Sequence, residues 1–236
     1  MTNAPNGRDD RPPTVAVIQT RVARPAALAV TRRGPVTSAI AKQPATAARL
    51  ALDLVNLHGD DQADRSVHGG PDKAVYCYPS EHAAAWSEDG FDLPAGSAGE
   101  NAVLQGATED EVRIGDIWRW GDAVVQISQP RAPCFKLALH TGRKDIALAM
   151  ITSGRSGWYL RTIEPGEVDT TGAMELLERD DANATLLATF AVQFPGHRAE
   201  ADDPATVDAV LRSPALAPEW SGYVRARNPL ADPDLP

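Results

Sequence analysis

The chain has 236 residues, of which 43% are apolar and 23% charged, and its formal net charge is −9. This length suffices for one large domain, or for a domain with a small appendage. The acidic balance argues against binding to nucleic-acid polymers, which requires a basic face. Two cysteines, Cys77 and Cys134, form at most one bridge and exclude a disulfide scaffold.

Two features of the sequence bear on its location. No segment reaches the ~20 consecutive apolar residues that a membrane-spanning helix needs. Residues 1–13 carry no apolar run of the kind that directs export, and we expect them to be disordered. We therefore expect a cytoplasmic protein without membrane contact.

Residues 14–170 combine short apolar runs with frequent Gly and Pro turns. Residues 48–57 are rich in Leu and Ala and also fit a helix, but Gly59 follows closely and favours a strand. Gly121-Asp122 joins two neighbouring runs as a hairpin. This pattern predicts a small closed or nearly closed β-barrel. The predicted strands cover residues 14–20, 48–57, 74–78, 102–104, 112–120, 123–128 and 157–163.

Helices are predicted at two places in the barrel and three places after it. The first two cover residues 80–86, with Ser80 as cap, and 144–153, ended by Gly154. Residues 171–227 should form three short helices, and 228–236 a loose tail. The fold class is therefore mainly β with α (α+β), a barrel followed by a small three-helix appendage. The helix starts in the appendage are expected at Asp181, Asp203-Pro204 and Pro218.

Polar segments between these elements contain few metal-binding patterns. The five histidines show no i, i+4 pair, and no nucleotide-binding glycine motif follows a strand. The acidic segment 109–111 reads as a solvated turn. Residues 58–72, in contrast, form a polar loop long enough to be functional. The loop ends in His68-Gly-Gly-Pro-Asp72, whose glycines permit close backbone approach to a ligand. Lys73, the next residue, can neutralise a phosphate.

The most informative stretch is Gln126–Leu137, which contains Cys134. Two prolines end the preceding strand and make the turn before the cysteine rigid. Arg131 and Lys136 lie close to the thiol in sequence, and cations favour the thiolate that attacks electrophiles or binds soft metals. The alternative is a buried, inert cysteine that fills space. A nucleophile activated by His68 or His140 is a further reading.

Several motifs in order resemble the MOSC-domain proteins of the YiiM type. The resemblance covers about residues 14–170, and the helical unit is similar to the one those proteins carry. It implies a β-barrel-like fold, a pterin molybdenum cofactor, and reduction of N-hydroxylated base analogues such as 6-hydroxylaminopurine. The matching motifs are His68–His82 with Trp86, Gly99-Glu-Asn101, Ile114-Gly-Asp116, Ser128–Leu137 and Gly154–Arg161.

The resemblance also implies roles for individual residues. Cys134 falls on the position of the family's cysteine and is the implied molybdenum ligand. The positions of His68, Lys73, Asn101 and Arg131 are expected to line the cofactor pocket. The implied partners are a flavoprotein electron donor and a small N-hydroxylated substrate, and a homodimer is compatible with the sequence.

Three functions remain open at this stage. The leading hypothesis is a reductase that depends on the molybdenum cofactor, with Cys134 holding the metal. The second is a sulfur or cofactor carrier in which Cys134 bears a persulfide and nothing is reduced. The third is a binding module that sequesters modified bases. Metal content separates the first hypothesis from the third, and sulfane sulfur on Cys134 identifies the second.

Overall fold

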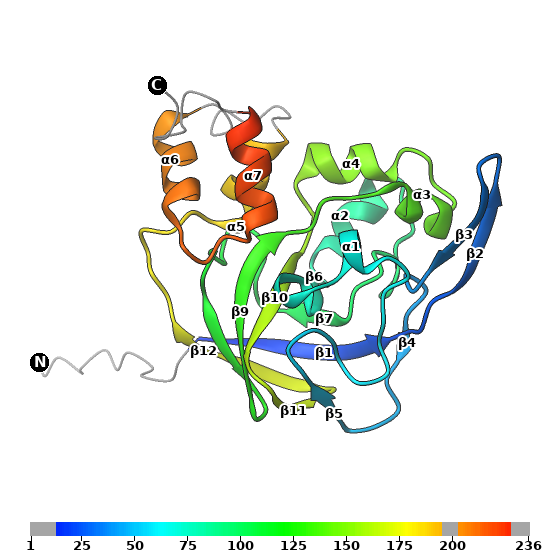
Figure 1. Cartoon of the computed structure of the whole chain (residues 1–236), viewed down its shortest axis with the longest axis horizontal. Coiled ribbons are helices and arrows are strands. Elements are labelled where there is room, and N and C mark those ends of the chain that lie inside the picture. The colour runs from blue at the N-terminus through cyan, green and yellow to red at the C-terminus, as the bar shows by residue number, and fades with distance from the viewer. Residues whose placement is uncertain (1–12, 195–202, 228–236) are drawn as a thin grey trace, which may run out of the picture.

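The computed structural model describes residues 13–194 and 203–227 (Figure 1). Seven strands form a closed ring, which confirms the predicted α+β class and the β-barrel. β6 and β7 are parallel, and the other neighbours in the ring are antiparallel. In ring order the strands are β1 (Thr14–Val22), β12 (Gly172–Glu178), β8 (Ile117–Trp120), β9 (Ala123–Pro130), β10 (Trp158–Glu164), β6 (Val75–Pro79) and β7 (Ala102–Gln105).

Smaller pairs of strands decorate the ring. β4 (Gln43–Pro44) pairs with β1, and β5 (Arg49–Leu52) pairs with β11 (Gly166–Asp169). β2 (Ala26–Thr31) and β3 (Gly34–Ser38) form a hairpin of their own. This hairpin projects from the barrel next to helix α3 (Phe135–Thr141) (Figure 1).

Helices cover the outside of the ring. α1, η1, α2, α3 and α4 lie in the barrel part of the chain, and α5, α6 and α7 form a separate group (Figure 1). The predicted end of α4 is confirmed, because Gly154 has a left-handed φ of 76°. The bounds are α1 (Arg65–His68), η1 (Pro71–Lys73), α2 (His82–Glu88), α3 (Phe135–Thr141), α4 (Ile146–Ser153), α5 (Leu186–Gln193), α6 (Pro204–Arg212) and α7 (Pro218–Arg227).

Two of the predicted helix starts were wrong. Ser80 does not cap α2, which begins at His82 with no side-chain cap bond. α5 is capped by Thr185 rather than Asp181, through a 3.1 Å bond from the amide of Ala188. The prediction for Asp203 is confirmed, since its carboxylate accepts from the amide of Thr206 at 2.9 Å.

The barrel extends further along the chain than predicted. Strand β12 pairs with both β1 and β8, so it closes the ring. The predicted domain boundary at residue 170 therefore lies too early, and the helical unit begins only after Glu178. The predicted strand 112–120 is also shorter, because only Ile117–Trp120 joins the ladder. The predictions for residues 1–12, 195–202 and 228–236 lie outside the described residues.

The three C-terminal helices pack on one another and on the barrel, as predicted. Phe190, Phe194 and Trp220 form an aromatic cluster with ring centroids 4.9–6.3 Å apart. The amide of Ala217 donates to the carbonyl of Ser128 at 3.0 Å, which ties the start of α7 to β9. The helical unit is thus anchored beside the strand that leads to Cys134.

Strand β6 is buried on both faces, because one face packs into the barrel core and the other against helices outside the barrel. Side chains of a strand alternate between faces, so Val75 and Cys77 join the barrel core while Tyr76 and Tyr78 join a second cluster outside it. That second cluster includes residues of α2, α3 and α4. Two apolar layers therefore meet at β6, and the outer one supports the site.

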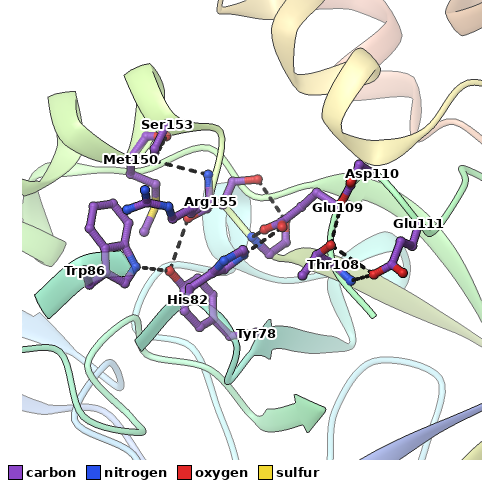
Figure 2. Close-up of polar contacts among 12 residues, drawn as sticks. Tyr78, His82, Trp86, Thr108, Glu109, Asp110, Glu111, Met150, Ser153 and Arg155 are labelled. Atoms are coloured by element: carbon purple, nitrogen blue, oxygen red, sulfur yellow. Dashed lines mark hydrogen bonds and ion pairs between the residues drawn. The ribbon is translucent and has the colours of Figure 1, made fainter. Parts of the chain in front are cut away.

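A buried polar network stiffens this outer layer (Figure 2). His82 Nε2 lies 2.7 Å from Oε2 of Glu109, and the amide of Gly157 donates to Oε1 of Glu109 at 2.7 Å. Trp86 Nε1 donates to the hydroxyl of Tyr78 at 2.7 Å. Glu109 is only 3% exposed, so interpreting it as part of a solvated turn was wrong. The partner that makes its burial tolerable lies 27 residues away in sequence.

Candidate active site

A cavity opens on the outer side of the barrel. It is bounded by the base of the β2–β3 hairpin, the loop before α1, the start of α3 and the outward-facing tyrosines of β6 and β10. The structure brings all five predicted site residues to this one cavity. They are His68, Lys73, Asn101, Arg131 and Cys134.

Cys134 lies between β9 and α3. Its backbone is extended, with φ −124° and ψ 169°, and it directly precedes the first residue of α3. Burial raises the pKa of the thiol, but the hydrogen bond with His68, the charge of Arg131 and the backbone N–H of Lys136 outweigh it. Together they lower the pKa of Cys134 to about 7. The predicted effect of Lys136 therefore comes from its amide, and a large thiolate fraction exists near neutral pH.

Arg131 is a buried cation at the base of the cavity. Arg131 is 5% exposed. Its guanidinium donates to Met150 Sδ at 3.2 Å and to the carbonyl of Ala98 at 3.5 Å. Its Cζ lies 5.4 Å from the ring centroid of Tyr76. Within residues 13–194 and 203–227 no ion pair includes Arg131. Because a buried charge without a counterion is costly, this position favours an anion.

Asn101 lines the cavity, but its amide serves the scaffold. Its Nδ2 donates to the carbonyl of Arg21 at 3.2 Å and to Oδ2 of Asp60 at 3.0 Å, while Oδ1 accepts from the amide of Tyr76 at 3.1 Å. Asp60 also accepts a 2.5 Å bond from Lys42, whose side chain is 8% exposed. Burial lowers the pKa of Lys42, against the attraction of Asp60. Asn101 therefore holds one wall of the cavity together.

Lys73 connects the cavity to the C-terminal helices. Its ammonium donates to the carbonyl of Val67 at 2.7 Å and to the carboxylate of Glu219 on α7. The hydroxyl of Tyr223 donates to the other oxygen of Glu219 at 2.9 Å. An ammonium has three hydrogens, so one remains for a ligand in the cavity.

The cavity wall next to Ala98, whose carbonyl accepts from Arg131, requires a glycine. Gly99 has a φ of +82°, in the left-handed region, and a Cβ added there would lie 2.5 Å from Cγ1 of Ile40. Both the backbone conformation and this close approach disfavour any other residue. The Gly99-Glu-Asn101 motif thus shapes the cavity through its glycine and its asparagine.

Several cavity residues were missed by the sequence-based prediction. Lys42, Tyr76 and Tyr159 line the cavity with the predicted set, and the two tyrosine rings lie 5.3 Å apart. Tyr76 and Tyr159 fall inside motifs that carried the family resemblance, so the sequence contained a signal that could have identified them as cavity residues. Lys42 gives no such signal, because its partner Asp60 meets it only in the folded chain.

The two cysteines should differ sharply in reactivity. Cys77 is fully buried, and burial raises the pKa of its thiol. We expect alkylation of metal-free protein by iodoacetamide to modify Cys134 alone, at a rate that rises with pH and reaches half its maximum near pH 7. Peptide mapping over pH 5–9 measures this. Modification of Cys77 first, or a midpoint near the ordinary thiol value of ~8.5, would contradict the assignment.

Two negative findings apply to the described part of the chain. Residues 13–194 and 203–227 contain no group of three or more His, Cys, Asp or Glu side chains arranged to hold a metal ion. Among the same residues, none of the helices has the length and apolar character to cross a membrane. A metal bound in the cavity would therefore have to bring most of its own ligands, with Cys134 as the protein's contribution.

The barrel, its C-terminal helices and the cysteine-containing cavity define a MOSC-domain protein. The family model for the MOSC domain matches residues 64–175, which include all the predicted site residues. The crystal structure of YiiM from Geobacillus stearothermophilus superposes with a TM-score of 0.73 at 31% identity, covering 90% of this chain and 98% of that one. The chain belongs to the MOSC-domain family.

Two curated proteins are similar to this chain over most or part of its length. The uncharacterized protein YflK of Bacillus subtilis is 40% identical over 78% of this chain and 82% of its own length. A Gibberella moniliformis protein named "Reductase" is 34% identical over 62% of this chain, and the match spans 27% of its length. The chain is therefore similar both to a protein of its own size and to one part of a longer reductase.

Proposed function

We propose that this protein reduces small N-hydroxylated compounds with a molybdenum cofactor bound in the cavity. One observation carries the proposal: the Cys134 thiol, whose pKa is lowered to about 7, lies beside the buried Arg131, which makes no ion pair within residues 13–194 and 203–227. A soft thiolate donor next to a fixed positive charge suits a soft metal carried by an anionic organic group. The relative named "Reductase" supports the type of reaction.

The residues present fit such a cofactor. Cys134 would hold the metal, while Arg131 and the remaining hydrogen of Lys73 would contact the pterin phosphate. When bound, the cofactor would supply the two-electron redox chemistry. The protein would orient the cofactor and balance its negative charge. The cations on the cavity wall serve this purpose in a chain that is acidic overall.

The reaction consumes two electrons and two protons. The N–O bond of R–NH–OH breaks, and the products are R–NH₂ and water. His68 lies against Cys134 and lines the cavity, so its imidazole can hold a proton next to the reacting centre. Tyr159 lines the cavity and is only partly buried, so its ring offers apolar surface against which a purine can stack.

Turnover of a defined substrate tests the proposal. Protein produced in a host that makes the cofactor should convert 6-hydroxylaminopurine to adenine with reduced methyl viologen as electron donor. Cys77→Ala is the matched control, because Cys77 lies in the barrel core and does not line the cavity. Loaded wild-type protein that yields no adenine would contradict the proposal.

A second candidate uses the same thiol. Cys134 is only partly buried and its pKa is low, which also suits a carrier that holds sulfur as a persulfide. Cold cyanolysis of freshly purified protein decides between the two. Stoichiometric thiocyanate that disappears in Cys134→Ser, from protein without molybdenum, would favour the carrier over the reductase.

A further inference from the structure

Two long segments of this acidic chain contain no aspartate or glutamate. They are residues 14–52 and residues 123–144, whereas the whole chain has 32 acidic residues and 23 Lys and Arg. Both segments carry several arginines and lysines. The charge is therefore distributed unevenly along the sequence.

The fold brings the two segments together at the mouth of the cavity. The β2–β3 hairpin comes from the first segment and α3 from the second, and they contact each other (Figure 1). Residues 38–40 at the base of the hairpin line the cavity, and so does Lys136 on α3. The acid-free segments thus contribute to the wall of the candidate active site, together with the loop that contains Asp61.

The cations at the hairpin tip are available for a partner. Lys42, Arg49 and Arg143 of the two segments form ion pairs with Asp60, Asp122 and Asp145, respectively. Arg32 and Arg33 are exposed and take part in no ion pair among the residues that the structure describes. Their positive charge faces solvent.

Large apolar side chains accompany these cations. Val30 on β2 is 86% exposed, and Phe135, the residue after Cys134, is 61% exposed. Phe135 lines a hollow together with Arg32 and Arg33. Exposed apolar anchors surrounded by charged residues are typical of protein-binding surfaces. We call the surface made by Val30, Arg32, Arg33, Phe135 and Lys136 the hairpin surface.

We propose that the hairpin surface docks an acidic flavoprotein that delivers electrons to the site. This inference rests on the proposed reductase function, which requires two electrons for each N–O bond. The reduced flavin supplies two electrons and two protons and becomes oxidised, while R–NH–OH becomes R–NH₂ and water. Docking at this surface places the donor over the cavity entrance, beside the segment that carries Cys134. Complementary charge then steers the encounter.

Charge reversal with two electron donors tests the inference. The variant R32E/R33E is compared with R119E/R212E, which reverses two exposed arginines on β8 and α6 that do not line the cavity. The protein probe is dithionite-reduced flavodoxin, a small acidic flavoprotein. The small-molecule probe is reduced methyl viologen, which reaches the cavity without docking. Binding of flavodoxin is also measured directly by titration calorimetry at low and high salt.

R32E/R33E should lose at least about tenfold in flavodoxin binding and in flavodoxin-driven turnover at low salt, and R32Q/R33Q should lose less. Both should keep wild-type turnover with methyl viologen, and the control pair should match wild type with either donor. Flavodoxin binding that is absent, insensitive to salt or unchanged in R32E/R33E would overturn the docking inference. Self-association that R32E/R33E abolishes would also overturn it, because a second copy would then occupy the surface. Failure of the proposed function differs from these results, since methyl viologen would then give no turnover in any variant.

Discussion

Replacing Cys134 with serine should abolish reduction of 6-hydroxylaminopurine while the protein stays folded. A hydroxyl is a hard and weakly acidic donor, so it cannot replace the thiolate as a ligand for molybdenum. Loss of groups that merely support a metal ligand already costs about 10- to 100-fold, and loss of the ligand itself should exceed that. Turnover with reduced methyl viologen measures the effect.

The fold should tolerate this change because Cys134 belongs to neither apolar cluster and has an ordinary extended backbone. Cys77→Ala provides the opposite control. It should lower stability modestly, since Cys77 is fully buried, and leave turnover intact. A Cys134→Ser protein with wild-type turnover would contradict the assigned role, and an unfolded one would show up in the thermal melt.

Replacing Arg131 with methionine should weaken function and preserve or raise stability. Methionine retains apolar volume beside Met150 and Tyr76 but removes the buried charge. Loss of that charge should raise the pKa of Cys134, which Arg131 helps to lower. Loss of a charge-assisted contact to an anion typically costs ~1.5–3 kcal/mol, so cofactor retention should fall by about tenfold or more.

Stability should respond in the other direction, because a buried cation without a carboxylate partner is costly in the empty protein. Thermal melts of metal-free protein, together with the pH profile of alkylation, measure both effects. Since Cys134 reacts as the thiolate, a raised pKa moves the rise in its reactivity to higher pH. An Arg131→Met variant that melts well below wild type, with an unchanged alkylation profile, would show that Arg131 serves the fold instead.

The barrel could be predicted from the sequence because its strands are short apolar runs between Gly and Pro turns. The closing strand β12 was missed because Gly172–Glu178 has four polar or small residues and only three large apolar ones. The prediction therefore grouped this segment with the helices that follow. Its strand conformation depends on pairing with β1 and β8 at distant positions. Such tertiary pairing overrides local pattern.

The site, like the barrel, was predictable where its residues are close in sequence and not where they meet through the fold. Cys134 and Arg131 are close in sequence, so their mutual influence could be anticipated from spacing alone. Glu109 and Lys42 could not be placed, because His82 and Asp60, which make their burial tolerable, are supplied by remote segments. The contact from Glu219 to Lys73 was equally invisible, since 146 residues separate them. Local chemistry was predictable, and the network that surrounds it required the fold.

Metal analysis of purified protein measures directly whether the cavity holds a molybdenum cofactor through Cys134. Wild-type protein and Cys134→Ser, both purified from a host that makes the molybdenum cofactor, should be analysed for molybdenum and for pterin released on denaturation. We expect about one molybdenum and one pterin for each wild-type chain, and a large loss of molybdenum in Cys134→Ser. Wild-type protein free of molybdenum and pterin, or equal molybdenum in both proteins, would contradict this expectation.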